Sequence, residues 1–161
     1  MLAAYAELAW VRYGDARDAA IRLDEAIDAF LAAPDAASLA AARDAWRAAR
    51  EAYLVTEVFR FYGGPIDNDD DGPEGLINAW PLDEAYIDGV LGDPTTGIIN
   101  DPAVALSAET LVGLNEQGGE ENIATGYHAI EFLLWGQDHD PDGPGDRPFT
   151  DFLTDETATA P

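Results

Sequence analysis

Helical periodicity without strand alternation is the feature that most constrains this chain. Apolar side chains recur at helical spacing from Leu2 to Ala32, and Pro34 ends that pattern. Asp35 or Ser38 can cap a second helix, which the spacing extends to about Phe61. The apolar stripe of this second helix consists of Leu39, Ala42, Trp46, Ala49 and Tyr53. Because no segment shows sustained alternation of apolar and polar residues, we predict an all-α fold.

Glycine and proline residues divide the rest of the chain into shorter elements. We predict helices from about Pro81 to Leu91, from a cap at Ser107 to about Asn115, and from about Glu120 to Trp135. Residues 137–161 read as loop and tail. The simplest arrangement is one domain over residues 1–161, an up-and-down helical bundle of the four-helix type with long acidic loops.

The charge balance restricts the partners of this domain. The chain has 32 acidic and 8 basic residues and a formal net charge of -24, so it lacks the cations that nucleic-acid binding needs. Its 47% hydrophobic residues can still form a core. No apolar run approaches the roughly 20 residues of a transmembrane helix. Without cysteine there is no disulfide or cysteine nucleophile, and residues 1–5 show no secretory signal.

Two titratable residues stand out in the nearly apolar segment 126–136. At about 100° per residue, His128 and Glu131 share one face of the predicted helix. A neutral imidazole and a carboxylate are both metal ligands, so the pair is a candidate metal site. The alternative is a hydrogen bond that merely satisfies two polar groups inside the fold.

Further charged residues lie on faces where a core would be expected. Glu57 and Arg60 continue the apolar stripe of the second helix, and a buried charge needs a partner or a metal. An ion pair between them, or a helix end in solvent, is the alternative.

Asp83 and Glu84 fall in the predicted first turn after Pro81, where they could simply compensate the helix dipole.

Two acidic loops and a set of aromatic residues have simpler interpretations. Residues 67–72 and 138–143 each open like a calcium loop, D-x-D-x-D-G, but the twelfth positions are Asn78 and Phe149 instead of glutamate. We therefore interpret both as solvated loops. Most aromatic side chains on the predicted helices are expected in the core: Trp46, Tyr53, Phe59, Phe61, Trp80, Tyr86, Phe132 and Trp135.

Three segments resemble the imelysin family. The sequence GYHAIE at residues 126–131 matches the family signature G-x-H-x-x-E, and FLLWGQD continues it as in iron-regulated protein A-like members. The segments EVFRFYGGPID, residues 57–67, and NAWPLDEAYID, residues 78–88, resemble the family in the expected order. The resemblance implies a helical protein of two bundle-like halves with a site at their junction. This chain resembles the first half. The resemblance therefore implies that the second helical half of the family architecture is a partner of this chain.

The family resemblance also implies a location and two functions. It implies a periplasmic or envelope-attached, extracytoplasmic protein that acts either in iron acquisition, with envelope iron-uptake components, or as a metal-dependent peptidase. A zinc peptidase usually presents three protein ligands, often through H-E-x-x-H, which this sequence lacks. The second histidine, His139, falls in an acidic loop outside the signature. One histidine with several carboxylates favours iron, with zinc or calcium as alternatives.

The predicted metal ligands are His128, Glu131, Glu57 and Asp83, with Arg60 and Glu84 as groups that support them. In a peptidase, Glu131 or Glu57 would act as general base on metal-bound water. Because the imidazole must be neutral to bind a metal, affinity should fall in acid. The remaining alternative is an interaction domain in which the histidine–glutamate pair is structural and acidity maintains solubility.

Overall fold

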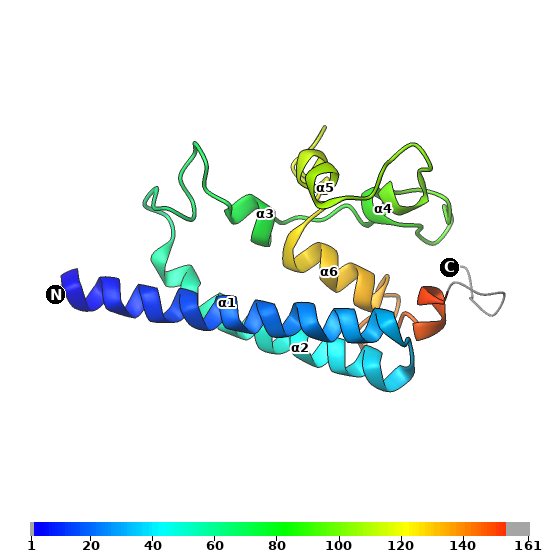
Figure 1. The fold of residues 1–161 in the computed structure, drawn as a ribbon. Coiled ribbons are helices and arrows are strands. Elements are labelled where there is room, and N and C mark those ends of the chain that lie inside the picture. Colours follow the sequence, from blue (N-terminus) through cyan, green and yellow to red (C-terminus); the bar gives the residue numbers. More distant parts are fainter. Residues whose placement is uncertain (1, 154–161) are drawn as a thin grey trace. The chain divides into compact units, whose positions relative to one another are not determined.

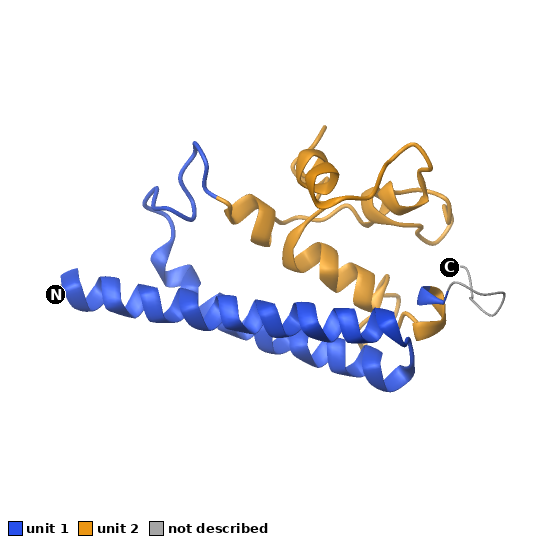
Figure 2. Ribbon diagram, viewed as in Figure 1, with its two compact units in different colours: residues 1–72, 152–158 blue, residues 73–151, 159–161 orange. Residues whose placement is uncertain are grey.

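The computed structural model describes residues 2–153, and the chain divides into two compact units (Figure 2). Of the described residues, unit 1 comprises 2–72 and 152–153, and unit 2 comprises 73–151. Regular secondary structure in the described residues is helical, apart from an isolated antiparallel bridge between Val90 and Asp93. The all-α prediction is therefore confirmed. The end of the predicted tail, residues 154–161, lies outside the described part.

Unit 1 is built on a helical hairpin of α1 (Leu2–Ala32) and α2 (Ala36–Leu54), which lie side by side (Figure 1). The turn between them ends in the predicted cap, Asp35. Its carboxylate accepts a hydrogen bond from the Ser38 amide at 2.7 Å, and the Ser38 hydroxyl accepts one from the Asp35 amide at 3.1 Å. This reciprocal capping box satisfies two amides that an open helix end would leave without partners.

The predicted stripe of α2 is the buried face of the hairpin. All five of its members are buried: Leu39, Ala42, Trp46, Ala49 and Tyr53. The buried residues of α1 are Ala16, Ala19, Leu23 and Phe30. Alanines on both helices leave room for the larger side chains opposite, so the hairpin core mixes small and large residues. Phe152 adds to this unit, since its ring centroid lies 4.7 Å from that of Phe30.

The end of α2 differs from the prediction in its geometry. The α-helix stops at Leu54, and a tighter 3-10 helix, η1 (Val55–Phe59), continues the chain. Phe59 is buried against α1, with its ring centroid 5.4 Å from that of Tyr5. Phe61 leaves the helix with a φ of 70° and is 81% exposed. The prediction of a core position for Phe61 was wrong because the helical register ends before that residue.

Unit 2 consists of short helices joined by loops (Figure 1). They are α3 (Glu74–Asn78), α4 (Glu84–Ile87), η2 (Ile98–Asn100), α5 (Ala108–Leu114) and α6 (Gly126–Trp135), followed by η3 (Phe149–Phe152), whose last residue belongs to unit 1. Ser107 caps α5 as predicted, accepting a hydrogen bond from the Thr110 amide at 3.1 Å. The core of the unit joins Ile87, Ile123, Ala129 and Phe132.

Two predicted helix starts in unit 2 were wrong, and the helix expected to reach Leu91 ends at Ile87. The helix expected from Pro81 begins only at Glu84, because Asp83 has an extended backbone and caps it. The helix expected from Glu120 begins at Gly126, because residues 116–125 form turns and an extended cap instead. Both errors placed loop residues in helices. None of the helices in the described residues is long and apolar enough to span a bilayer.

Candidate metal site

The first residue of α6 packs unusually closely on α3. Gly126 has a φ of +84°, and a Cβ built there would lie 2.4 Å from the carbonyl oxygen of Ile77. Only glycine fits such an approach without strain. The Thr125 hydroxyl also donates a hydrogen bond to the Leu76 carbonyl oxygen at 3.0 Å. The glycine of G-x-H-x-x-E therefore places the start of α6 directly against the end of α3.

Asn115 holds the same junction from the other side. Its side-chain oxygen accepts hydrogen bonds from the Ala124 amide at 3.0 Å and from the amide and hydroxyl of Thr125 at 3.2 and 3.1 Å. Its side-chain nitrogen donates to the Gly75 carbonyl oxygen at 3.0 Å. Sequence reasoning placed Asn115 only at a helix end. The single available signal was an amide residue, which can both donate and accept, at the exit of a helix.

His128 and Glu131 meet one turn into α6. Nδ1 of His128 lies 3.1 Å from Oε2 of Glu131, and 15% of the histidine side chain and 43% of the glutamate side chain are exposed. The indole of Trp80 contacts the imidazole in a tilted arrangement, with ring centroids 4.8 Å apart and a 54° angle between the planes. The predicted face of α6 is thus formed as expected. Trp80 itself is 67% exposed, so its predicted core position was wrong.

The hydrogen bond assigns roles to the two imidazole nitrogens. An ionised carboxylate only accepts, so Nδ1 carries the proton and Nε2 is the nitrogen suited to a metal. Carboxylates paired with metal-binding histidines orient the ring in this way. An imidazole and a carboxylate fit the donor preferences of iron. Among the described residues, no group of three or more histidine, aspartate or glutamate side chains is arranged to hold a metal ion.

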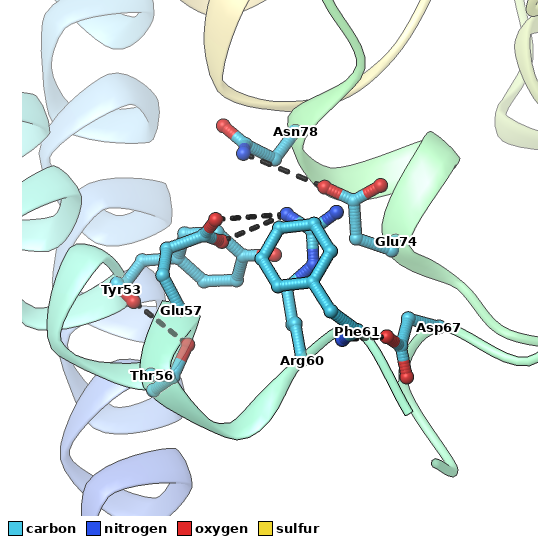
Figure 3. Close-up of polar contacts among 8 residues, drawn as sticks. All are labelled: Tyr53, Thr56, Glu57, Arg60, Phe61, Asp67, Glu74 and Asn78. Carbon is cyan, nitrogen blue, oxygen red and sulfur yellow. Dashed lines mark hydrogen bonds and ion pairs between the residues drawn. The ribbon is translucent and has the colours of Figure 1, made fainter. Parts of the chain in front are cut away.

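Glu57 and Arg60 form an ion pair in unit 1 (Figure 3). Nη1 of Arg60 lies 3.0 and 2.9 Å from the two carboxylate oxygens of Glu57, and both side chains are largely buried. The ion-pair interpretation is therefore confirmed, while a metal-binding role for Glu57 stays a prediction. In the same segment Asp67 accepts hydrogen bonds from the amides of Phe61 and Gly64, which closes the loop after η1.

Asp83 and Glu84 have local roles at α4. The Asp83 carboxylate accepts a hydrogen bond from the Ala85 amide at 3.0 Å and so caps the helix. Glu84 accepts one from the side-chain nitrogen of Gln137 at 2.7 Å, and Gln137 in turn accepts from the Leu91 amide at 2.6 Å. These contacts fasten the end of α6 to α4. A part for either acidic residue in metal binding stays a prediction.

Each of the two acidic loops contains hydrogen bonds between its own residues. In the first, the Asn68 side chain accepts from the amides of Asp70 and Asp71, both at 3.0 Å. In the second, Asp138 accepts from the Asp140 amide at 3.1 Å. Such side-chain turns are usual in solvated loops. His139 is exposed and borders a pocket of about 700 Å³ that also includes Trp135 and Arg147, away from the first turn of α6.

A buried ion pair in unit 2 escaped sequence analysis. Nη1 of Arg147 lies 2.7 Å from Oδ2 of Asp88, and the other carboxylate oxygen accepts from the Gly89 amide and the Asn100 side chain. Arg147 also stacks on Phe132 of α6, with the guanidinium carbon 5.5 Å from the ring centroid. A signal was present, because Arg147 is the one basic residue after position 60.

The fold and this site define a helical protein in which a histidine–glutamate pair follows, on the same helix, a glycine in close contact with α3. The family model described as Imelysin (peptidase M75) matches residues 9–160, so the chain belongs to the imelysin family. It is 34% identical over 116 residues to iron-regulated protein A of Synechococcus elongatus. That match covers 72% of this chain and 25% of the relative, so this chain spans about a quarter of the length of the relative.

Proposed function

We propose that this chain is an extracytoplasmic, iron-binding member of the imelysin family that acts in iron acquisition. The observation that carries the proposal is the His128–Glu131 pair, whose carboxylate holds the imidazole at 3.1 Å. The name of the relative, iron-regulated protein A, supports iron as the metal. The proposal includes a location in the periplasm or cell envelope. It also includes two partners, namely envelope iron-uptake components and the second helical half of the family.

The two side chains suit an iron ion for different reasons. Nε2 of His128 would donate a lone pair, and Glu131 would supply negative charge, either as an oxygen ligand or through its hydrogen bond to Nδ1. The partial exposure of Glu131 leaves space for an ion and its water molecules. Glu57 and Asp83 are proposed as further oxygen ligands, with Arg60 and Glu84 supporting them. Zinc and calcium are the competing ions.

Metal stoichiometry tests the proposal directly. The purified chain is incubated separately with iron, zinc, manganese and calcium, and bound metal is measured by mass spectrometry. We expect about one equivalent of iron, lost in a His128→Ala/Glu131→Ala variant of unchanged helicity. His139→Ala is the matched control, because it removes the other histidine of the chain from an exposed loop. Equal binding by the double variant and the wild type would refute the site.

Single variants then separate the remaining ligands. Glu57→Gln and Asp83→Asn each remove a negative charge while keeping the shape of the side chain. A ligand role predicts weaker iron binding in either variant, whereas unchanged binding would leave that residue with its structural contact alone. Glu57→Gln is paired with Arg60→Gln, so that loss of the ion pair is measured apart from loss of a ligand.

The family description also contains the word peptidase, so hydrolysis is the second candidate. A general base beside metal-bound water would have to be Glu131 or Glu57. Metal-dependent cleavage of a peptide library that disappears in His128→Ala would select this function. Iron uptake without cleavage would select binding. If neither occurs, the domain has an interaction role and the histidine–glutamate pair is structural.

A further inference from the structure

Trp80 combines high exposure with a specific contact. Its side chain is 67% exposed, although burial in the core would be the usual way to stabilise an indole. Its ring centroid lies 4.8 Å from that of His128, whose side chain is only 15% exposed. The indole therefore packs against the imidazole in a tilted arrangement while remaining at the surface of unit 2.

Two contacts, one from Glu131 and one from Trp80, constrain the orientation of the His128 imidazole. Glu131 bonds to the ring edge at Nδ1, which determines which nitrogen faces the carboxylate. Trp80 packs against the ring with its plane tilted by 54°, and this contact restricts rotation of the imidazole. Because a metal binds an imidazole nitrogen along its in-plane lone pair, the plane of the ring determines where the metal can lie. Neither contact alone defines both angles.

The backbone on either side of Trp80 is anchored. Before it, the end of α3 is held against α6 by the close approach of Gly126 to the Ile77 carbonyl oxygen. After it, the amide of Asp83 donates a hydrogen bond to the Glu121 carbonyl oxygen at 2.7 Å. The indole is thus carried by a short segment fixed at both ends, which suits a side chain that must hold another in place.

We propose that Trp80 is a positioning residue of the candidate metal site, which holds the His128 imidazole in the plane required for coordination through Nε2. The proposal rests on the proposed iron binding. It assigns a role to the exposed tryptophan of the NAWPLD segment that burial does not explain.

Iron affinity of Trp80 variants is the first test. Trp80→Phe keeps an aromatic face, whereas Trp80→Leu keeps apolar volume without one. We expect Trp80→Leu to weaken Fe²⁺ binding about tenfold or more under anaerobic conditions, and Trp80→Phe to stay within about threefold of the wild type. Trp10→Leu is the matched control, since Trp10 is 82% exposed on α1 in unit 1. Equal losses in the leucine and phenylalanine variants would overturn the proposal.

Nitrogen NMR of the metal-free protein gives an independent readout. With only two histidines in the chain, exposed His139 serves as an internal reference. We expect neutral His128 to carry its proton on Nδ1 in all three proteins, because Glu131 sets that tautomer, and we expect its ring to be more mobile in Trp80→Leu than in the wild type and Trp80→Phe. Unchanged ring dynamics in Trp80→Leu would overturn the positioning role. Failure of the wild type to bind iron would refute the proposed function, while this readout still tests Trp80.

Discussion

The carboxylate of Asp88 and the guanidinium of Arg147 pair at 2.7 Å although they are 59 residues apart in the sequence. Only 7% and 10% of their side chains are exposed. The Arg147 amide also donates to the Trp135 carbonyl oxygen at 2.8 Å. The pair therefore fixes the segment after α6 to the segment after α4, so its loss should affect the whole of unit 2.

Removing the Asp88 charge should destabilise the protein strongly. Asp88→Asn removes the negative charge that lies 2.7 Å from the buried guanidinium, and breaking a buried ion pair costs about 3–5 kcal/mol. Urea unfolding followed by circular dichroism measures the change. Asp15→Asn is the control, because it breaks an exposed pair with Arg12 at 3.2 Å and should change stability by less than about 1 kcal/mol. Similar losses in both variants would contradict a special role for burial.

The signature glycine should tolerate no side chain. Gly126→Ala puts a methyl group 2.4 Å from the Ile77 carbonyl oxygen on a backbone with φ of +84°. We expect a loss of about 2 kcal/mol or more in the free energy of unfolding. Gly14→Ala provides the opposite case, since no atom lies within 4 Å of its Cβ position inside α1. That variant should gain about 0.5–1 kcal/mol, and a loss there would show that the helix is constrained in another way.

Acid should weaken the hairpin cap. The Ser38 amide that donates to the Asp35 carboxylate lowers the pKa of Asp35 below its usual value of 3.8. A lowered folded-state pKa contributes stability that is present above the unfolded pKa and is lost as pH falls through the folded value. The stability difference between the wild type and Asp35→Asn should therefore shrink between pH 5 and about pH 2. A difference that grows in acid would contradict this sign.

Added salt should stabilise the fold. A net charge of -24 on 161 residues repels itself at low ionic strength, and the Debye length shrinks from about 30 Å at 0.01 M to about 3 Å at 1 M. We expect the urea midpoint to rise with NaCl over this range, measured by circular dichroism. Sucrose in place of salt gives the control for effects other than screening. A constant midpoint in NaCl would argue that the charges are already well separated.

Local patterns in the sequence predicted the hairpin well. The stripe of α2 and the caps at Asp35 and Ser107 follow from residue spacing and side-chain chemistry within a few positions. The His128–Glu131 contact was predictable for the same reason, since residues three apart on a helix are neighbours. The start of α6 was not predictable, because it depends on hydrogen bonds that the Ala124 and Thr125 amides donate to the Asn115 side chain rather than on helix propensity.

The sequence by itself determined the helical class, the buried face of α2 and the adjacency of His128 and Glu131, because each is set by neighbours along the chain. Tertiary structure alone decided that Trp80 contacts the imidazole, that Gly126 meets Ile77 and that Asp88 pairs with Arg147. These contacts join segments separated by loops, and loop residues carry no periodicity from which their partners could be predicted. The exposed position of Trp80 illustrates the difference: its residue type favours a core, but its place is set by the backbone around it.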